Sequence, residues 1–145
     1  MKKELIMPDL SLASHWAGRR VTTAELLGSP ALIHFWSISC PKCIRSLPVI
    51  RSIAKHCRGK LRTVAVHQPL GTGDMDADTV AKTFFAHHMN EPLLIDNRRR
   101  LAAAFGNRYV PAYYLFDDDG RLVEYQLGER GALRIDATVR RLIGA

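Results

Sequence analysis

The stretch that decides the fold reads Trp36-Ser37-Ile38-Ser39-Cys40-Pro41-Lys42-Cys43. An apolar run over residues 31–35 comes before it and predicts a buried strand. The residues after it repeat apolar side chains at helical spacing, which predicts a helix from Pro41 to about His56. Pro41 suits the first turn of a helix, where no backbone N–H donor is needed. Two cysteines with two residues between them therefore lie where a strand gives way to a helix.

The position of this cysteine pair indicates its chemistry. The start of a helix offers free backbone N–H groups and the positive end of the helix dipole, and both stabilise a thiolate. Because the thiolate is the reactive form of cysteine, the setting predicts a dithiol–disulfide redox centre. Half of a zinc site is the alternative. Structural zinc usually takes four ligands, however, and the sequence has no second Cys-x-x-Cys and no His-x-x-x-His pair.

Length and composition fit one globular domain. The chain has 145 residues, of which 47% are hydrophobic and 24% charged, which is enough for one hydrophobic core. We expect a single domain over residues 1–145, with an N-terminal hairpin extension (1–28) and a core (29–145). Three cysteines cannot build a disulfide framework, so one close pair suggests redox use and Cys57 is expected to be structural.

The charge balance limits the partners and the location. The formal net charge is +7, but the basic residues are scattered, with 98–100 as the only run. We therefore expect no nucleic-acid binding, and an acidic protein partner is the milder alternative. No stretch is long and apolar enough for a transmembrane segment, and the first residues lack the apolar core of a signal peptide. As written, the chain is expected to be a cytoplasmic monomer; a leader before this stretch would make it periplasmic or otherwise extracytoplasmic.

Further elements alternate along the chain. Short strands at Leu10–Leu12 and Arg20–Thr22 are predicted on either side of a turn at His15–Gly18, followed by a helical turn at Thr23–Leu27. The other predicted elements are strands at 30–36, 61–66, 93–95, 113–116 and 122–126, and helices at 41–56, 76–88, 99–105 and 133–143. Strands that alternate with helices and end in a hairpin predict an α/β domain, with a central mixed sheet and helices on both faces.

Several features together resemble the thioredoxin-like superfamily. They are the segment 35–43, Pro48 at the position of that family's helix-kink proline, and Val110-Pro111 before a strand. The N-terminal stretch resembles the TlpA-like thiol–disulfide oxidoreductases of the redoxin branch. The resemblance implies the thioredoxin-like fold and an enzyme that reduces or exchanges disulfides in protein substrates without a metal or organic cofactor. An upstream dithiol reductant would regenerate it, and the activity would serve cell redox homeostasis and antioxidant defence.

The resemblance also assigns roles around the cysteine pair. Cys40 is the expected nucleophile and should be exposed, whereas Cys43 should be more buried and resolve the mixed disulfide. Pro111 is expected to be cis and opposite the pair, which leaves the Val110 backbone free to pair with an extended substrate chain. The alternative is a trans proline that opens an edge strand. Trp36 is expected to pack beside the cysteines.

Three polar residues near the pair have two interpretations each. Lys42 either favours the Cys40 thiolate through its charge or is an ordinary exposed lysine. His34 lies in a buried strand, where thioredoxins have an acid, and is either a proton acceptor for Cys43 or a core histidine bonded to backbone. His67 is either a ligand contact at the carboxyl end of a strand or a capped loop histidine.

Other functions compete with the redox interpretation. A thiol peroxidase of the peroxiredoxin kind needs a serine or threonine placed to support peroxide, for which Ser37 is a weak match. A non-enzymatic binding module would carry an inert cysteine pair. A copper(I) chaperone would hold its metal through Cys40, Cys43 and His67. The acidic run Asp117–Asp119 predicts a solvated turn rather than a calcium loop.

Overall fold

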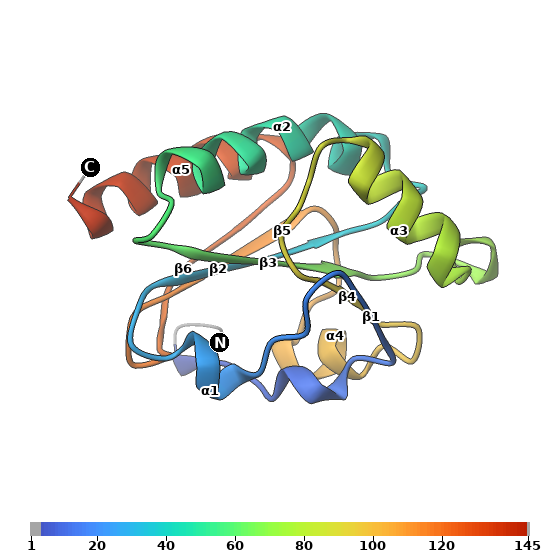
Figure 1. Cartoon of the computed structure of the whole chain (residues 1–145), viewed down its shortest axis with the longest axis horizontal. Coiled ribbons are helices and arrows are strands. Elements are labelled where there is room, and N and C mark those ends of the chain that lie inside the picture. The colour runs from blue at the N-terminus through green and yellow to red at the C-terminus, as the bar shows by residue number, and fades with distance from the viewer. Residues whose placement is uncertain (1–3, 145) are drawn as a thin grey trace.

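A mixed sheet separates two helical layers in the computed structural model, which describes residues 4–144 (Figure 1). The strands are β1 (His15–Ala17), β2 (Ala31–Trp36), β3 (Arg62–His67), β4 (Leu93–Ile95), β5 (Ala112–Phe116) and β6 (Leu122–Leu127). The helices are α1 (Thr23–Leu26), α2 (Pro41–His56), α3 (Ala77–Ala86), α4 (Arg100–Phe105) and α5 (Glu129–Ile143). Helices α2, α3 and α5 cover one face of the sheet, and α1 and α4 cover the other (Figure 1). The predicted α/β architecture is confirmed.

The sheet places β2 at its centre. Its strand order is β1-β4-β3-β2-β5-β6, and β2 pairs parallel with β3 and antiparallel with β5. Every residue of β2 is buried, as expected for a strand that is covered on both faces. Because side chains alternate along a strand, Leu32 and Trp36 enter the core under α2, whereas Ile33 and Phe35 enter the core over α4. The cysteine pair follows directly from the carboxyl end of this central strand.

Helix α2 begins and ends where the sequence predicts. Cys40 is its N-cap residue and Pro41 its first residue, and Pro48 lies inside the helix. Four apolar residues at helical spacing are buried against the sheet: Cys43, Leu47, Ile50 and Ile53. Lys55 and His56 lie in the last turn, where a positive charge interacts favourably with the negative end of the helix dipole. The helix therefore holds the cysteines at one end of the sheet by packing along its whole length.

The predicted strand at Leu10–Leu12 is wrong. These residues form a 3₁₀ turn, η2, in which two of the backbone N–H groups bond to side chains. The Asp9 carboxylate accepts the Ser11 N–H at 3.0 Å, and the Thr23 hydroxyl accepts the Leu10 N–H at 3.0 Å. Those donors are then not available for a strand ladder.

The N-terminal hairpin is also wrong. The strand of this region is β1 at His15–Ala17, where the sequence predicts a turn, and it pairs antiparallel with β4. Arg20–Thr22 is not a strand, and Thr22 instead caps α1 through a capping box with Glu25. The described part of the first 28 residues thus extends one sheet edge and helps to cover one face.

Two helix boundaries also differ. Helix α5 begins at Glu129, four residues before the predicted start, and it follows Gly128, whose φ is +80°. Helix α3 ends at Ala86, and His88 adopts a positive φ of 62°. Among residues 4–144, no helix combines the length and apolar character needed to cross a bilayer.

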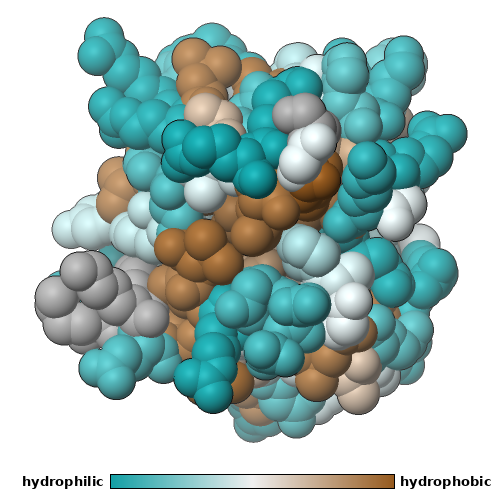
Figure 2. Space-filling model, turned by 90° about the vertical axis from the view of Figure 1, so that its left-hand side faces the viewer, coloured by the Kyte–Doolittle hydropathy of each residue, from teal (hydrophilic) through white to brown (hydrophobic). Residues whose placement is uncertain are grey.

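The end of the molecule away from the cysteine pair carries an apolar band (Figure 2). Here the N-terminal segment meets the β5–β6 turn through a bridge between Ile6 and Arg121. Gly120 in that turn has a φ of +77°, and a Cβ there would lie 2.9 Å from a Leu27 methyl group. The positive φ of the turn therefore favours glycine, whereas the exposed Leu27 side chain could move to make room for a Cβ.

Candidate active site

The two cysteines share the first turn of α2. The Cys40 Sγ accepts the Cys43 N–H at 3.2 Å, and both residues are free thiols. Cys43 is 1% exposed, and Cys40 is 9% exposed. The predicted order of burial is confirmed, but the expectation that Cys40 is exposed is wrong, because Cys40 is buried. It nevertheless lines a hollow together with Val110.

Burial keeps the Cys43 thiol protonated, and the protonated thiol is a poor nucleophile. Burial, together with the hydrogen bond to Cys40, raises the pKa of the Cys43 thiol well above that of a free cysteine. Cys43 therefore needs a proton acceptor when it attacks. Burial also raises the pKa of Cys57, which lies at the far end of α2, in agreement with a structural role.

The Val110–Pro111 peptide bond is cis, so that prediction is confirmed. The Cys40 thiol lies 4.0 Å from the Val110 carbonyl oxygen, at the limit of a weak S–H donor contact. Strand β5 begins at the next residue, Ala112, and pairs with β2 opposite Phe35. The sheet thus brings the Val110 backbone against the cysteine pair, although 70 residues separate Val110 from Cys40.

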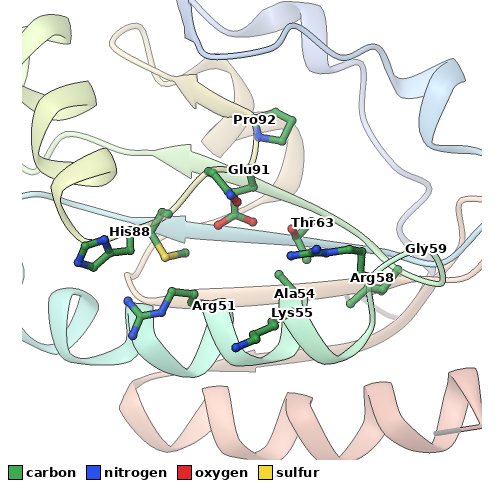
Figure 3. A pocket seen from close by; sticks show the side chains of 12 residues that line it. Arg51, Ala54, Lys55, Arg58, Gly59, Thr63, His88, Glu91 and Pro92 are labelled. Carbon is green, nitrogen blue, oxygen red and sulfur yellow. The ribbon is translucent and has the colours of Figure 1, made fainter.

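His34 has a side-chain partner that the sequence did not reveal. Its Nε2 lies 2.9 Å from Glu91 Oε1, and both side chains are buried. The alternative in which His34 bonds to backbone is therefore wrong. Glu91 also lines a hollow of about 350 Å³ between α2 and the sheet, where Arg51 and Arg58 lie at the rim (Figure 3). Glu91 is therefore the member of the buried pair that faces this hollow.

Tyr113 lies in the same core as the cysteines and was not predicted as a site residue. Burial raises the pKa of Tyr113, and its hydroxyl is within electrostatic range of Cys43. The nearby Ser46 hydroxyl donates to the Lys42 carbonyl at 2.8 Å. The His34 ring stacks on Tyr113 with centroids 6.5 Å apart. The only signal for Tyr113 in the sequence is its position two residues after Pro111, in a predicted strand.

Asp74 holds the loop before the cysteines. One carboxylate oxygen, Oδ2, accepts the Ser37 hydroxyl at 3.0 Å, the Ser39 hydroxyl at 2.7 Å and the Leu70 N–H at 2.9 Å. Burial alone would raise the pKa of Asp74, but these hydrogen bonds outweigh burial and lower it. The sequence places Asp74 in a loop and gives no sign of this role. Because the Ser37 hydroxyl points to Asp74, the match to a peroxidase site is not supported.

His67 is a structural residue behind the same loop. It is fully buried, and its Nε2 accepts the Ile38 N–H at 3.1 Å. Burial lowers the pKa of His67 to about 4, although Asp74 opposes the shift, so the ring is neutral at neutral pH. The interpretation as a ligand contact is wrong, because the ring does not reach the surface.

Trp36 packs beside the cysteines as predicted. It is buried in the core that contains Cys40 and Cys43. Its ring stacks on Phe84 of α3 with centroids 5.4 Å apart and meets the His67 ring edge-on at 5.0 Å. Trp36 therefore packs in the core beneath α2 and against His67, whose ring accepts a hydrogen bond from the active-site loop.

The residues proposed for copper do not converge. Within residues 4–144, the group close enough to share an ion is Asp117–Asp119 rather than Cys40, Cys43 and His67. The Asp117 carboxylate accepts the N–H groups of Asp119 and Arg121 at 2.9 and 3.0 Å. These bonds close the β5–β6 turn, as the prediction of a solvated turn requires.

Comparison with known proteins agrees with this geometry. The family model described as Redoxin matches residues 2–138. The thiol-disulfide oxidoreductase YkuV of Bacillus subtilis is 37% identical over 144 residues, which cover 99% of this chain and 97% of YkuV. The solution structure of a thioredoxin-like protein in the oxidised form has a TM-score of 0.91 at 36% identity and covers 99% of this chain and 98% of its own. The superfamily protein SPOA0173 has a TM-score of 0.85 at 20% identity, with 97% of each chain covered.

Proposed function

The chain belongs to the redoxin family and is a thiol–disulfide oxidoreductase of thioredoxin-like fold. From this premise we propose that Cys40 is the nucleophile and that Cys43 is the resolving thiol. The observation that carries this assignment is the burial difference within one helical turn. Cys40 is 9% exposed and lines an open hollow, whereas Cys43 is 1% exposed and does not line it. A substrate sulfur can therefore approach Cys40 and not Cys43.

The reduction of a substrate disulfide proceeds in two exchanges. The Cys40 thiolate attacks one substrate sulfur, so a Cys40–substrate disulfide forms as the substrate S–S bond breaks, and the released thiolate takes a proton from water. The Cys43 thiol then loses its proton and attacks Cys40 Sγ, which releases the second substrate thiolate. The substrate gains two electrons and two protons, and Cys40 and Cys43 become a disulfide. An upstream dithiol reduces that disulfide by the reverse sequence.

The His34–Glu91 pair is the proposed acceptor of the Cys43 proton. Cys43 is surrounded by apolar core, and its raised pKa means that its proton does not leave without help. His34 lies on the same face of β2 as Leu32 and Trp36, which pack in that core. Lys42, exposed at the helix start, is proposed to favour the Cys40 thiolate by its charge.

Pro111 and Val110 are proposed to hold the substrate backbone. Within residues 4–144, the Val110 N–H has no backbone partner, and its carbonyl meets only the weak Cys40 contact. An extended substrate segment could bond to both groups as an added strand, next to the sulfur that it presents to Cys40. The partners are accordingly proposed to be a protein with a disulfide and a dithiol donor, and residues 1–145 are proposed to act as one domain.

Thiol labelling tests the redox pair. The protein is oxidised, its free thiols are alkylated, and the modified residues are mapped by mass spectrometry. A Cys40–Cys43 disulfide with Cys57 alkylated only after unfolding is the expected result. The reduced protein should also reduce insulin, and the Cys40→Ser variant should not. A protein in which Cys40 and Cys43 never pair would overturn the assignment.

A further inference from the structure

Two hollows adjoin at the cysteine end of α2. The first, of about 540 Å³, is lined by Ser39, Cys40, Pro41, Lys42, Arg45, Leu70, Arg108, Tyr109 and Val110. The second, of about 560 Å³, is lined by Lys42, Leu127, Gly128, Glu129, Arg130 and Leu133. Lys42 lines both hollows, so they form one surface around the start of α2. We call this surface the client face.

The client face is positively charged. The residues that line it include four cations, and Glu129 is the one carboxylate among them. Glu129 is already bound by Arg45, whose guanidinium donates to both carboxylate oxygens at 2.9 and 3.1 Å. Arg108 and Arg130 form no ion pair within residues 4–144. The start of α2 adds its own positive dipole next to Lys42. An approaching carboxylate would thus meet cations that have no partner.

The client face also concentrates exposed apolar side chains. Large apolar residues that are strongly exposed number ten in the described chain, and four of them line these two hollows. They are Leu70, Tyr109, Leu127 and Leu133, each between 46% and 63% exposed. A surface that combines arginine and tyrosine with apolar side chains is typical of protein interfaces. Leu70 and Tyr109 lie beside Cys40, and the two leucines lie beyond Lys42.

We propose that the client face selects oxidised protein segments in which Asp or Glu lies close to the disulfide, together with a large apolar side chain. This inference rests on the proposed function, because it names the substrates that Cys40 attacks. A round hollow of 540 Å³ is about 10 Å across, and an extended chain crosses that distance in about three residues. The acidic residue should therefore lie within about three positions of the cysteine that Cys40 attacks.

Paired peptides test the selection. Two peptides with the same internal disulfide carry either Asp or Lys on both sides of one cysteine, and the reduced protein is mixed with each at low salt. The readout is the ratio of the two second-order rate constants. We expect the Asp peptide to react about tenfold faster. The ratio should fall toward one as ionic strength rises, because salt screens the exposed charges.

Two charge-reversal variants locate the effect. Arg108→Glu should bring the ratio to about one or below. Lys60→Glu should leave it near the wild-type value, because Lys60 lies beyond the far end of α2, a 16-residue helix that is about 24 Å long. Equal rates for the two peptides, or equal effects of the two variants, would overturn the inference.

An uncharged small disulfide separates this inference from the proposed function. Wild-type protein should reduce 2-hydroxyethyl disulfide with Cys40–Cys43 oxidised as the product. If it does so and the peptides react equally, only the selection by charge is wrong. If it does not, the proposed function is wrong.

Discussion

Replacing Asp74 by alanine should loosen the active-site loop and destabilise the fold. Asp74 is 8% exposed, and its Oδ2 atom accepts three hydrogen bonds, from Ser37, Ser39 and the Leu70 N–H. The carboxylate therefore ties the segment before Cys40 to the loop that follows β3. In the variant, the exposed Ser39 hydroxyl can rotate toward water, but the Ser37 hydroxyl is fully buried and loses its acceptor. The Leu70 N–H cannot move away from its position without moving the loop.

The magnitude follows from the charge of the acceptor. A hydrogen bond to an ionised group contributes about 1.5–3 kcal/mol net. The three bonds share one oxygen, and the exposed Ser39 hydroxyl can bond to water instead. Their energies therefore do not add, and we expect Asp74→Ala to lower the free energy of unfolding by about 3 kcal/mol. Asp74→Asn keeps an acceptor oxygen without the charge and should cost about half as much.

Urea unfolding of the two variants measures these costs, with Asp76→Ala as the control. Asp76 is an exposed N-cap of α3 that bonds to the Asp78 N–H and the Thr79 hydroxyl, so its loss should cost about 1 kcal/mol. Hydrogen exchange adds a local readout, because the Leu70 amide should exchange faster in Asp74→Ala and not in Asp76→Ala. An Asp74→Ala variant no less stable than Asp76→Ala, with an unchanged Leu70 amide, would refute the reasoning.

Three further perturbations follow from the buried residues. The pKa of His67 is lowered to about 4 from 6.5, so the unfolded chain binds more protons than the folded chain between these pH values. Acidification from pH 6.5 to pH 4 should therefore lower the free energy of unfolding of the wild type by about 3 kcal/mol, and His67→Gln should not show this loss. Parallel curves of stability against pH for the two proteins would contradict this. Glu91→Ala should cost about 3 kcal/mol in urea unfolding because it leaves His34 buried without its partner, and Glu91→Gln should cost clearly less; equal costs would argue against the pair. Phe84→Ala should cost about 3–5 kcal/mol through the lost Trp36 stacking and burial, against under 1 kcal/mol for the half-exposed Phe85→Ala; a similar loss from both would count against that packing.

The elements that the sequence predicted well have strong local signals. Strand β2 is apolar except for His34, and α2 combines helical spacing with a proline in its first turn. Such signals need no knowledge of the rest of the chain. The cis form of the bond before Pro111 was instead predicted from the resemblance of the whole segment to a family. The local pattern of strand and helix and the resemblance to a family both pointed to Cys40 and Cys43 as the redox pair.

The residues that the sequence missed act through distant partners. Ser39 and Asp74 are 35 residues apart, and His34 and Glu91 are 57 apart. No pattern within either segment specifies the other, so only the folded chain shows these bonds. The error at Leu10–Leu12 has a partly local cause, because the adjacent Asp9 side chain bonds to the Ser11 N–H, while Thr23, 13 residues away, bonds to the Leu10 N–H.

The central claim is that Cys40 attacks and Cys43 resolves, and trapping the mixed disulfide tests it most directly. The reduced Cys43→Ser variant is mixed with a protein disulfide substrate, quenched with acid and mapped by mass spectrometry. We predict a stable disulfide between Cys40 and the substrate, and none in Cys40→Ser, because Cys43 is buried at 1% exposure. A substrate adduct on Cys43 in Cys40→Ser, or on Cys57 in either variant, would contradict the account.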